Sequence, residues 1–164
     1  MATANQQLSS YDSEGLTSAS DMKMAIVVSE WNEKITNGLL DGAKKTLLKE
    51  GLAEINLAIH FVPGSYELPL AAQFILEKAT VDAVICLGCV IQGETKHFDF
   101  VCQGISQGIK DVSLKYNKPV IFGVLTDNTM QQSIDRSGGK LGNKGVEAAV
   151  SAIKMVALQR KIQG

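Results

Sequence analysis

The fold is decided by a stretch in the middle of the chain, Ala83-Val-Ile-Cys-Leu-Gly-Cys-Val-Ile-Gln-Gly-Glu-Thr-Lys-His-Phe98. It begins with a short apolar run, Ala83 to Leu87, which is typical of a strand covered on both faces. A glycine-containing loop follows, and the helical spacing of the next apolar residues predicts a helix from Phe98 to Tyr116. Strand, loop and helix in this order form the repeating unit of a parallel sheet.

The same unit recurs on both sides of this stretch. Apolar runs predict further strands at residues 25–28, 55–62 and 120–125, and periodic apolar residues predict helices at 32–50, 67–78, 129–136 and 143–161. Asn32 is expected to cap the first of these helices and Gly51 to end it. The predicted fold is α/β, a three-layer αβα sandwich of flavodoxin-like type, in which a four-stranded parallel sheet is flanked by helices.

Length and composition limit the classes of function. The chain of 164 residues has the length of one domain, which we place at residues 22–164. The polar residues 1–21 are expected to form a flexible N-terminal arm, or a segment that orders only against a neighbour. The net charge of −1, with both signs interspersed, argues against nucleic-acid and membrane partners. Neither a signal peptide nor a run of about eighteen apolar residues occurs, so a cytoplasmic location is expected.

The three cysteines, Cys86, Cys89 and Cys102, are expected to be reduced thiols. Cys86 and Cys89 form a single C-x2-C motif without a second pair. Their odd spacing would place the side chains on opposite faces if the strand continued. A metal site is therefore not expected, and buried apolar packing is the favoured interpretation.

The loop after the central strand resembles a nucleotide phosphate loop with one change. Gly88 and Gly93 have the spacing of Gly-x4-Gly-Lys-[Ser/Thr], but Glu94 stands in the lysine position, where a carboxylate would repel a triphosphate. Gly93, the following amides and the Thr95 hydroxyl remain available, with the imidazole of His97 two residues on. The stretch indicates a site for one small phosphate beside a proton-transfer group. A strand-to-helix turn without a ligand remains an alternative.

Other candidates follow the remaining strands, whose carboxyl ends should meet at one edge of the sheet. Trp31 offers an aromatic face for a ring ligand, although packing under the first helix is an equal alternative. Glu67 could accept hydroxyl donors from a polyol or only stabilise a helix N-terminus. Arg136 and Lys144 flank a glycine-rich basic stretch that could reach an anion or be a solvated loop. His97 is the catalytic candidate, whereas His60, inside an apolar strand, is interpreted as structural.

Four segments together resemble the 6,7-dimethyl-8-ribityllumazine synthase family over about residues 23 to 158. They are Ile26-Val-Val-Ser-Glu-Trp-Asn32, Val62-Pro-Gly-Ser-Tyr-Glu-Leu-Pro69, Gly88-Cys-Val-Ile-Gln-Gly-Glu-Thr-Lys-His-Phe-Asp99 and Gly142-Asn-Lys-Gly145. The resemblance implies a transferase of riboflavin biosynthesis. This enzyme condenses 5-amino-6-(D-ribitylamino)uracil with 3,4-dihydroxy-2-butanone 4-phosphate, releases phosphate and water, and uses no metal or organic cofactor.

The resemblance also assigns roles to single residues. Trp31 would stack on the pyrimidine, and His97 would transfer protons. The ribityl chain would be held by Asn32, Ser65 and Glu67, the uracil edge by the backbone of Val90 and Ile91, and the phosphate by Glu94, Thr95 and Arg136. Phe122, Arg136 and Lys144 would come from the adjacent subunit, with Glu147 steadying Arg136. The expected catalytic set is His97, Arg136 and Lys144; the expected substrate-binding set is Trp31, Asn32, Ser65, Tyr66, Glu67, Val90, Ile91, Glu94, Thr95, Phe122, Arg136 and Lys144.

Oligomerisation is part of the function that the resemblance implies. Family members form pentamers, and some assemble twelve pentamers into an icosahedral capsid of sixty subunits. The stretch Gly138-Gly-Lys-Leu-Gly142 resembles the linker of shell formers, although Leu141 departs from the usual residue. A homo-oligomer with active sites between adjacent subunits is expected, and an association with riboflavin synthase is left open. A non-catalytic flavin- or pterin-binding carrier, or a shell protein of the same fold, is the alternative.

Overall fold

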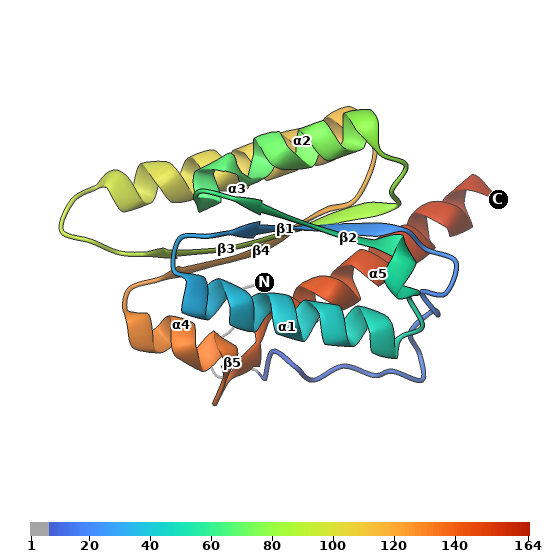
Figure 1. Ribbon diagram of the computed structural model, residues 1–164, viewed down its shortest axis with the longest axis horizontal. Helices are drawn as coiled ribbons and strands as arrows, with labels where there is room; N and C mark the ends of the chain where they lie inside the picture. The colour runs from blue at the N-terminus through green and yellow to red at the C-terminus, as the bar shows by residue number, and fades with distance from the viewer. Residues whose placement is uncertain (1–6) are drawn as a thin grey trace.

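A four-stranded parallel sheet forms the centre of the computed structural model, which describes residues 7–164 (Figure 1). Its strands are β1 (Met24–Ser29), β2 (Leu57–Val62), β3 (Ala83–Ile91) and β4 (Val120–Asp127). Their order in the sheet is β2-β1-β3-β4, so β2 and β4 lie at the two edges. Each strand is followed by a helix, as the alternating apolar pattern predicts.

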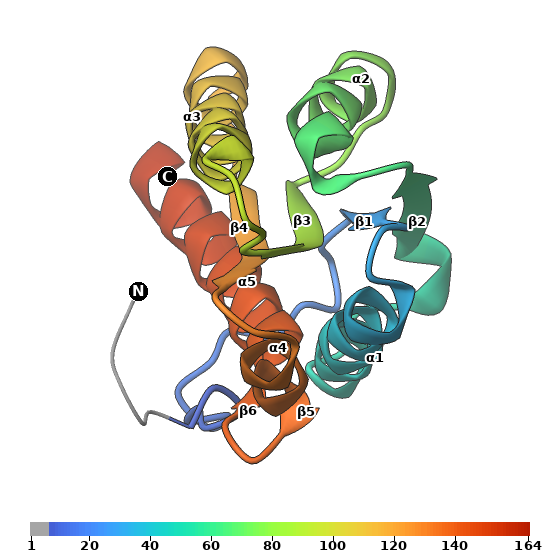
Figure 2. The ribbon, with the colours of Figure 1, turned by 90° about the vertical axis from the view of Figure 1, so that its left-hand side faces the viewer.

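The helices cover both faces of the sheet and confirm the three-layer prediction (Figure 2). On one face lie α2 (Leu68–Lys78) and α3 (His97–Tyr116); on the other lie α1 (Glu33–Lys49), α4 (Met130–Arg136) and α5 (Lys144–Gln163). Between α4 and α5 the chain forms a small antiparallel hairpin of β5 (Ser137–Gly139) and β6 (Gly142–Asn143). Within residues 7–164, no helix combines the length and apolar character needed to cross a membrane.

The central strand is longer than predicted. β3 continues four residues past Leu87 because β4 offers it a partner in register, as far as Ile91 opposite Asp127. The segment that resembles a phosphate loop is therefore strand up to Ile91 and loop only from residue 92 to 96. Cys86 and Cys89 belong to the apolar clusters on opposite sides of the sheet, which confirms the alternation expected from their spacing.

The first helix ends as predicted but begins differently. Gly51 follows its last turn with a φ of 99°, a conformation that favours glycine. Asn32 occupies the N-cap position in the left-handed region, with φ 61° and ψ 43°, and makes no side-chain capping bond. The prediction of a side-chain cap is wrong: the side chain is directed to β3, where its Nδ2 group donates to the carbonyl oxygen of Cys89 at 3.0 Å, and its oxygen accepts no amide of the first turn.

The N-terminal residues that the structure describes lie along the chain's own domain, beside α1 and the hairpin. The Ser9 hydroxyl accepts from the Asn143 amide at 2.9 Å, and the Tyr11 hydroxyl donates to Glu50 at 2.7 Å. Ala19 is completely buried in the core between the sheet and α1. Composition alone did not predict these contacts, because they depend on the surface that α1 and the hairpin provide. The part of the expected arm at residues 1–6 lies outside the described residues.

Candidate functional site

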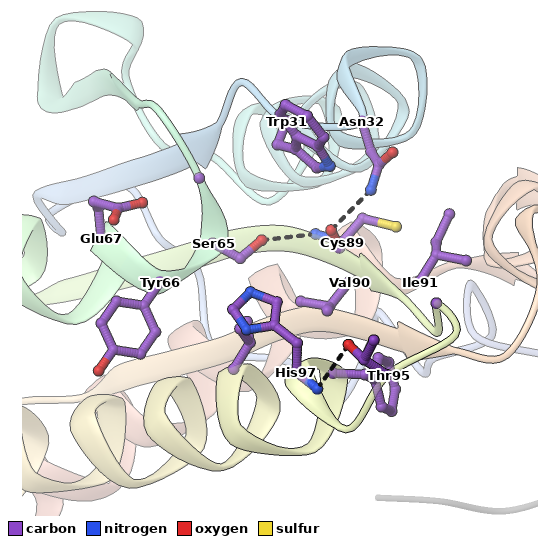
Figure 3. A pocket seen from close by; sticks show the side chains of 14 residues that line it. Trp31, Asn32, Ser65, Tyr66, Glu67, Cys89, Val90, Ile91, Thr95 and His97 are labelled. Carbon is purple, nitrogen blue, oxygen red and sulfur yellow. Dashed lines mark hydrogen bonds between the residues drawn. The ribbon is translucent and has the colours of Figure 1, made fainter.

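A cavity of about 430 Å³ opens at the carboxyl ends of β1, β2 and β3, where the strand-to-helix segments meet (Figure 3). This is the edge at which ligands of open α/β sheets bind. The residues that line it are Trp31, Asn32, Gly64, Ser65, Tyr66, Glu67, Cys89, Val90, Ile91, Gly93, Thr95, His97, Phe98 and Val101. The structure thus brings together expected residues from three of the four post-strand segments, with the exception of Glu94.

Trp31 lies directly after β1 at the mouth of the cavity, and 71% of its surface is exposed. Packing beneath the first helix, the alternative that the sequence left open, is excluded by this exposure. An indole in this place offers an apolar face to a planar ligand while its ring nitrogen stays accessible to water. The position suits a stacking partner for an aromatic ring.

The floor of the cavity is fixed by two polar side chains that bond to both backbone groups of one residue of β3, Cys89. The Ser65 hydroxyl accepts from the Cys89 amide at 3.2 Å, and the Asn32 amide donates to the Cys89 carbonyl at 3.0 Å (Figure 3). These bonds occupy both backbone groups of Cys89. The next residues of β3, Val90 and Ile91, also line the cavity.

Two residues of the second post-strand segment form the side of the cavity. The Tyr66 ring packs on α3 at Gly104, where an added Cβ would lie 2.7 Å from the ring. Glu67 occupies the N-cap position of α2 without a side-chain capping bond, so the carboxylate is not used as a helix cap. A carboxylate at the cavity can accept hydrogen bonds from the hydroxyls of a polyol.

His97 is the first residue of α3, and its imidazole points into the cavity (Figure 3). The backbone amide of His97 donates to the Thr95 hydroxyl at 3.3 Å, so Thr95 orders the start of the helix. The N-terminus of a helix of 20 residues carries a partial positive charge that favours an anion nearby. The loop thus combines an anion-binding helix end with a proton-transfer group. Glu94 lies exposed in the same loop, outside the lining of the cavity.

The residues that the resemblance assigns to an adjacent subunit lie away from this cavity. Phe122 is partly buried on the edge strand β4, Arg136 ends α4, and Lys144 begins α5. Lys144 forms an ion pair with Glu147 at 2.6 Å. Arg136 donates from Nη1 to the Gln132 carbonyl at 3.0 Å. The structure therefore separates the expected site into two groups of residues within one chain.

Sequence reasoning missed two buried polar residues beside the second group. Ser133 donates to Asp127 Oδ2 at 2.8 Å and accepts from the Cys89 thiol at 3.4 Å. Asp127 Oδ1 lies 3.8 Å from Arg136 Nη1. The available signal was a carboxylate at the end of a strand followed, six residues later, by a hydroxyl on a short helix. The spacing alone did not show that both are buried.

All three cysteines are free thiols. Burial raises the pKa of the Cys86 thiol to about 12, and it also raises the pKa of the Cys89 thiol. Both side chains are therefore neutral at physiological pH and poor metal ligands or nucleophiles. Within the described residues, no group of three or more His, Cys, Asp and Glu side chains is arranged to hold a metal ion.

Comparison with known proteins identifies the family. The family model described as 6,7-dimethyl-8-ribityllumazine synthase matches residues 21–160. Proteins of that name are similar to this chain over nearly its whole length. The one from Cytophaga hutchinsonii is 55% identical over 96% of this chain and 98% of its own. Those from Parabacteroides distasonis and Flavobacterium johnsoniae are each 55% identical, over 95% and 98% of this chain and 98% and 85% of their own. The chain therefore belongs to the 6,7-dimethyl-8-ribityllumazine synthase family.

Proposed function

We propose that the protein condenses 5-amino-6-(D-ribitylamino)uracil with 3,4-dihydroxy-2-butanone 4-phosphate, forming 6,7-dimethyl-8-ribityllumazine, phosphate and water. The observation that carries this proposal is the meeting of Trp31 and His97 in one cavity of about 430 Å³. An aromatic face for the pyrimidine and a proton-transfer group for the condensation are thereby placed on opposite sides of one space. The family membership supports the same reaction.

The pyrimidine substrate is held by the part of the cavity between Trp31 and the end of β3. Trp31 stacks on the ring, and the backbone of Val90 and Ile91 meets the uracil edge. The Ser65 hydroxyl, which only accepts from Cys89, keeps its hydrogen for a ribityl oxygen, and the Glu67 carboxylate accepts from ribityl hydroxyls. Asn32 acts at the ribityl end and, through its bond to Cys89, fixes the floor beneath the ring. Tyr66 closes the side of the ribityl site.

The phosphate of the second substrate binds at the start of α3. Gly93 lets the backbone approach the anion, since an added Cβ at this position would meet nothing within 4 Å. The amides of Glu94 and Thr95, the Thr95 hydroxyl and the helix N-terminus supply donors. Arg136 of an adjacent subunit adds the positive charge. Glu94 takes part through its backbone amide, because its carboxylate would repel the anion.

The chemistry then requires positioning and proton transfer. The amine of the uracil attacks the ketone carbon, and loss of water gives an imine. Removal of a proton from the neighbouring carbon expels the phosphate, and the second amine closes the ring with loss of another water. His97 accepts and returns these protons. Holding the two reactants side by side lowers the activation barrier by on the order of 7 kcal/mol or more. This is a larger effect on the rate than the factor of about 10²–10⁴ that general acid–base catalysis contributes.

The second group of residues completes the site of a neighbouring subunit. Phe122 lies on the edge strand β4, while Arg136 and Lys144 lie on the helices α4 and α5 that follow it, and none of the three lines the cavity of its own chain. A ring in which the β4 side of one subunit faces the cavity of the next would bring both groups together. We therefore propose a pentamer. We also propose a shell of twelve pentamers on the basis of the Gly138–Gly142 linker. An association with riboflavin synthase and a cytoplasmic location stay predictions.

An assay of the purified oligomer tests the reaction. The two proposed substrates are mixed with the protein, and the absorbance and fluorescence of the lumazine product are followed. Product that forms only when both substrates and protein are present is the expected result. Tight binding of a flavin or a pterin without product from the assembled protein would instead favour the carrier, and assembly without either activity would favour the shell protein.

A further inference from the structure

A buried chain of hydrogen bonds leads from the cavity floor to Asp127, which faces Arg136. The Cys89 thiol donates to Ser133 at 3.4 Å, and Ser133 donates to Asp127 Oδ2 at 2.8 Å. Asp127 Oδ1 faces the Arg136 guanidinium, with 3.8 Å between the oxygen and Nη1. Ser133 is fully buried and Asp127 is 8% exposed. A carboxylate is seldom buried to this extent unless its partners are defined.

The direction of each bond in this chain is fixed by the groups present. A serine hydroxyl has a single hydrogen, and Ser133 donates it to Oδ2 of Asp127. The lone pairs of Ser133 then accept from Cys89, whose thiol stays protonated because burial raises its pKa. With Oδ2 engaged by Ser133, the carboxylate cannot turn freely. Its second oxygen therefore keeps facing Arg136.

Asp127 also touches the loop that carries the proposed phosphate donors. Its backbone carbonyl accepts from the Gln92 amide at 2.9 Å, immediately before Gly93. The same residue thus joins the end of β4 to the start of the loop 92–96 and faces the guanidinium at the end of α4. Asp127 therefore lies between the cavity loop and Arg136, which belong to the two separate groups of residues that the proposed reaction uses.

We infer that Asp127, oriented by Ser133, is a positioning residue for Arg136. The inference rests on the proposed function, in which Arg136 binds the phosphate of the second substrate. Nη1 of Arg136 is directed inward by the Gln132 carbonyl and by the Asp127 carboxylate. The remaining N–H groups of the planar guanidinium are then presented together to an anion, which a bidentate contact requires. At 3.8 Å the carboxylate orients the cation by charge and leaves its donors available.

Asp127→Asn tests the inference because it keeps the size of the side chain and removes its charge. The Michaelis constant for the butanone phosphate should rise roughly tenfold, less than the 10²-fold loss that gross misplacement of a group causes. The constant for the pyrimidine should stay unchanged and kcat should change less, because the cavity residues of that substrate are untouched. Asp135→Asn is the matched control. It removes an equal charge from α4, the helix that carries Arg136, but the Asp135 carboxylate pairs with Lys140 at 3.0 Å. It should leave both constants unchanged.

Ser133→Ala keeps the charge of the Asp127 carboxylate but removes the hydroxyl that orients it. This variant still tests the inference if the Asp127→Asn protein fails to assemble. It should change the same constant in the same direction and by a smaller factor. Added to Arg136→Ala, either substitution should have no further effect, since residues that act through one group are not additive. Light scattering of each variant confirms that assembled oligomers are compared.

The outcomes separate this inference from the function on which it rests. If Arg136→Ala leaves the Michaelis constant for the butanone phosphate unchanged, the proposed phosphate role of Arg136 fails. If Arg136→Ala raises that constant while Asp127→Asn and Ser133→Ala leave it unchanged or lower it, only the positioning role is overturned. An equal rise in Asp135→Asn also overturns it, because any nearby charge would then have the same effect.

Discussion

Two glycines near the cavity, Gly88 and Gly93, have opposite surroundings although they are only five positions apart in the chain. A Cβ added to Gly88 would lie 2.5 Å from the Ser65 hydroxyl oxygen, whereas one added to Gly93 would meet nothing within 4 Å. Gly88 therefore lets Ser65 approach the backbone of β3. Gly93 leaves open the space that we assign to the phosphate. The same residue type serves internal packing at one position and ligand access at the other.

Gly93→Ala should separate binding from stability. The unfolding temperature should change little, because the new methyl group contacts no protein atom. The Michaelis constant for the butanone phosphate should rise several-fold, since the methyl group enters the proposed anion site. Steady-state kinetics and thermal unfolding of the same sample measure both quantities.

Gly88→Ala is the matched comparison for this prediction. It should lower the unfolding temperature, because the Ser65 hydroxyl that holds the Cys89 amide must move away from the added methyl group. An unchanged Michaelis constant in Gly93→Ala would show that the phosphate does not approach this part of the loop.

At the scale of elements, apolar periodicity predicted every helix longer than one turn and all four strands of the main sheet. It failed at the end of β3, where pairing with β4 extends the strand beyond the glycine that reads as its end. It failed again at the N-terminal segment, because Ser9 and Tyr11 are held by partners more than thirty residues away in the chain. Local patterns carry no information on contacts of that kind.

The candidate site was predictable to the extent that it follows strand ends. Trp31 and His97 could be placed at one edge of the sheet from the order of elements alone. Asp127 and Ser133 could not, because their importance arises from a short helix folding back over the end of β4. The patterns of strands and helices did not show that Arg136 lies away from the cavity. Only the family resemblance implied it, by assigning Arg136 to an adjacent subunit.

Asn143 joins three elements and should be the most sensitive helix cap in the described part of the chain. Its Oδ1 accepts from the Gly145 amide at the start of α5, and its Nδ2 donates to the Gly38 carbonyl of α1, both at 2.8 Å. Asn143→Ala should lower the free energy of unfolding by about 2 kcal/mol, because the cap of α5 and the bond to the partly buried Gly38 carbonyl of α1 are lost together. Denaturant unfolding measures the change.

Two further variants control this prediction. Thr129→Ala removes a cap with one side-chain bond, of 3.3 Å, at an exposed position, and it should cost about 1 kcal/mol or less. Asn143→Asp keeps the cap and loses the donor to Gly38, so it should give an intermediate loss. Equal losses in the Asn143→Ala and Thr129→Ala proteins would contradict the joining role.

At the scale of the molecule, apolar side chains are exposed beside the outer strands. Phe61, Leu70 and Phe74 line a second cavity of about 570 Å³ beside β2 and α2. Leu114 and Ile162 line another at the C-terminal ends of α3 and α5. Contiguous exposed apolar surface marks contacts with other molecules. Its occurrence on two different sides supports a head-to-tail ring rather than a twofold dimer.

Mixed oligomers should test whether neighbouring subunits share a site. His97→Ala damages the cavity side and should slow the reaction without abolishing it, while Arg136→Ala damages the β4 side. In oligomers assembled from both variants at equal amounts, about a quarter of the sites would combine an intact cavity with an intact arginine. The rate of product formation should then exceed that of either variant alone. A rate equal to the average of the two variants would show that each chain supplies its own arginine.

The exposed Trp31 is also the only tryptophan of the chain. Indole emission depends on the polarity of its surroundings and is quenched by a stacked ring. Emission at the cavity mouth should therefore change when a planar ligand displaces water from the indole face, without background from a second tryptophan. Unfolding should change this emission far less, because the ring is already wet in the native chain. Trp31 fluorescence should therefore report whether the cavity is occupied but should respond only weakly to denaturation. Unfolding of this protein is better followed by circular dichroism.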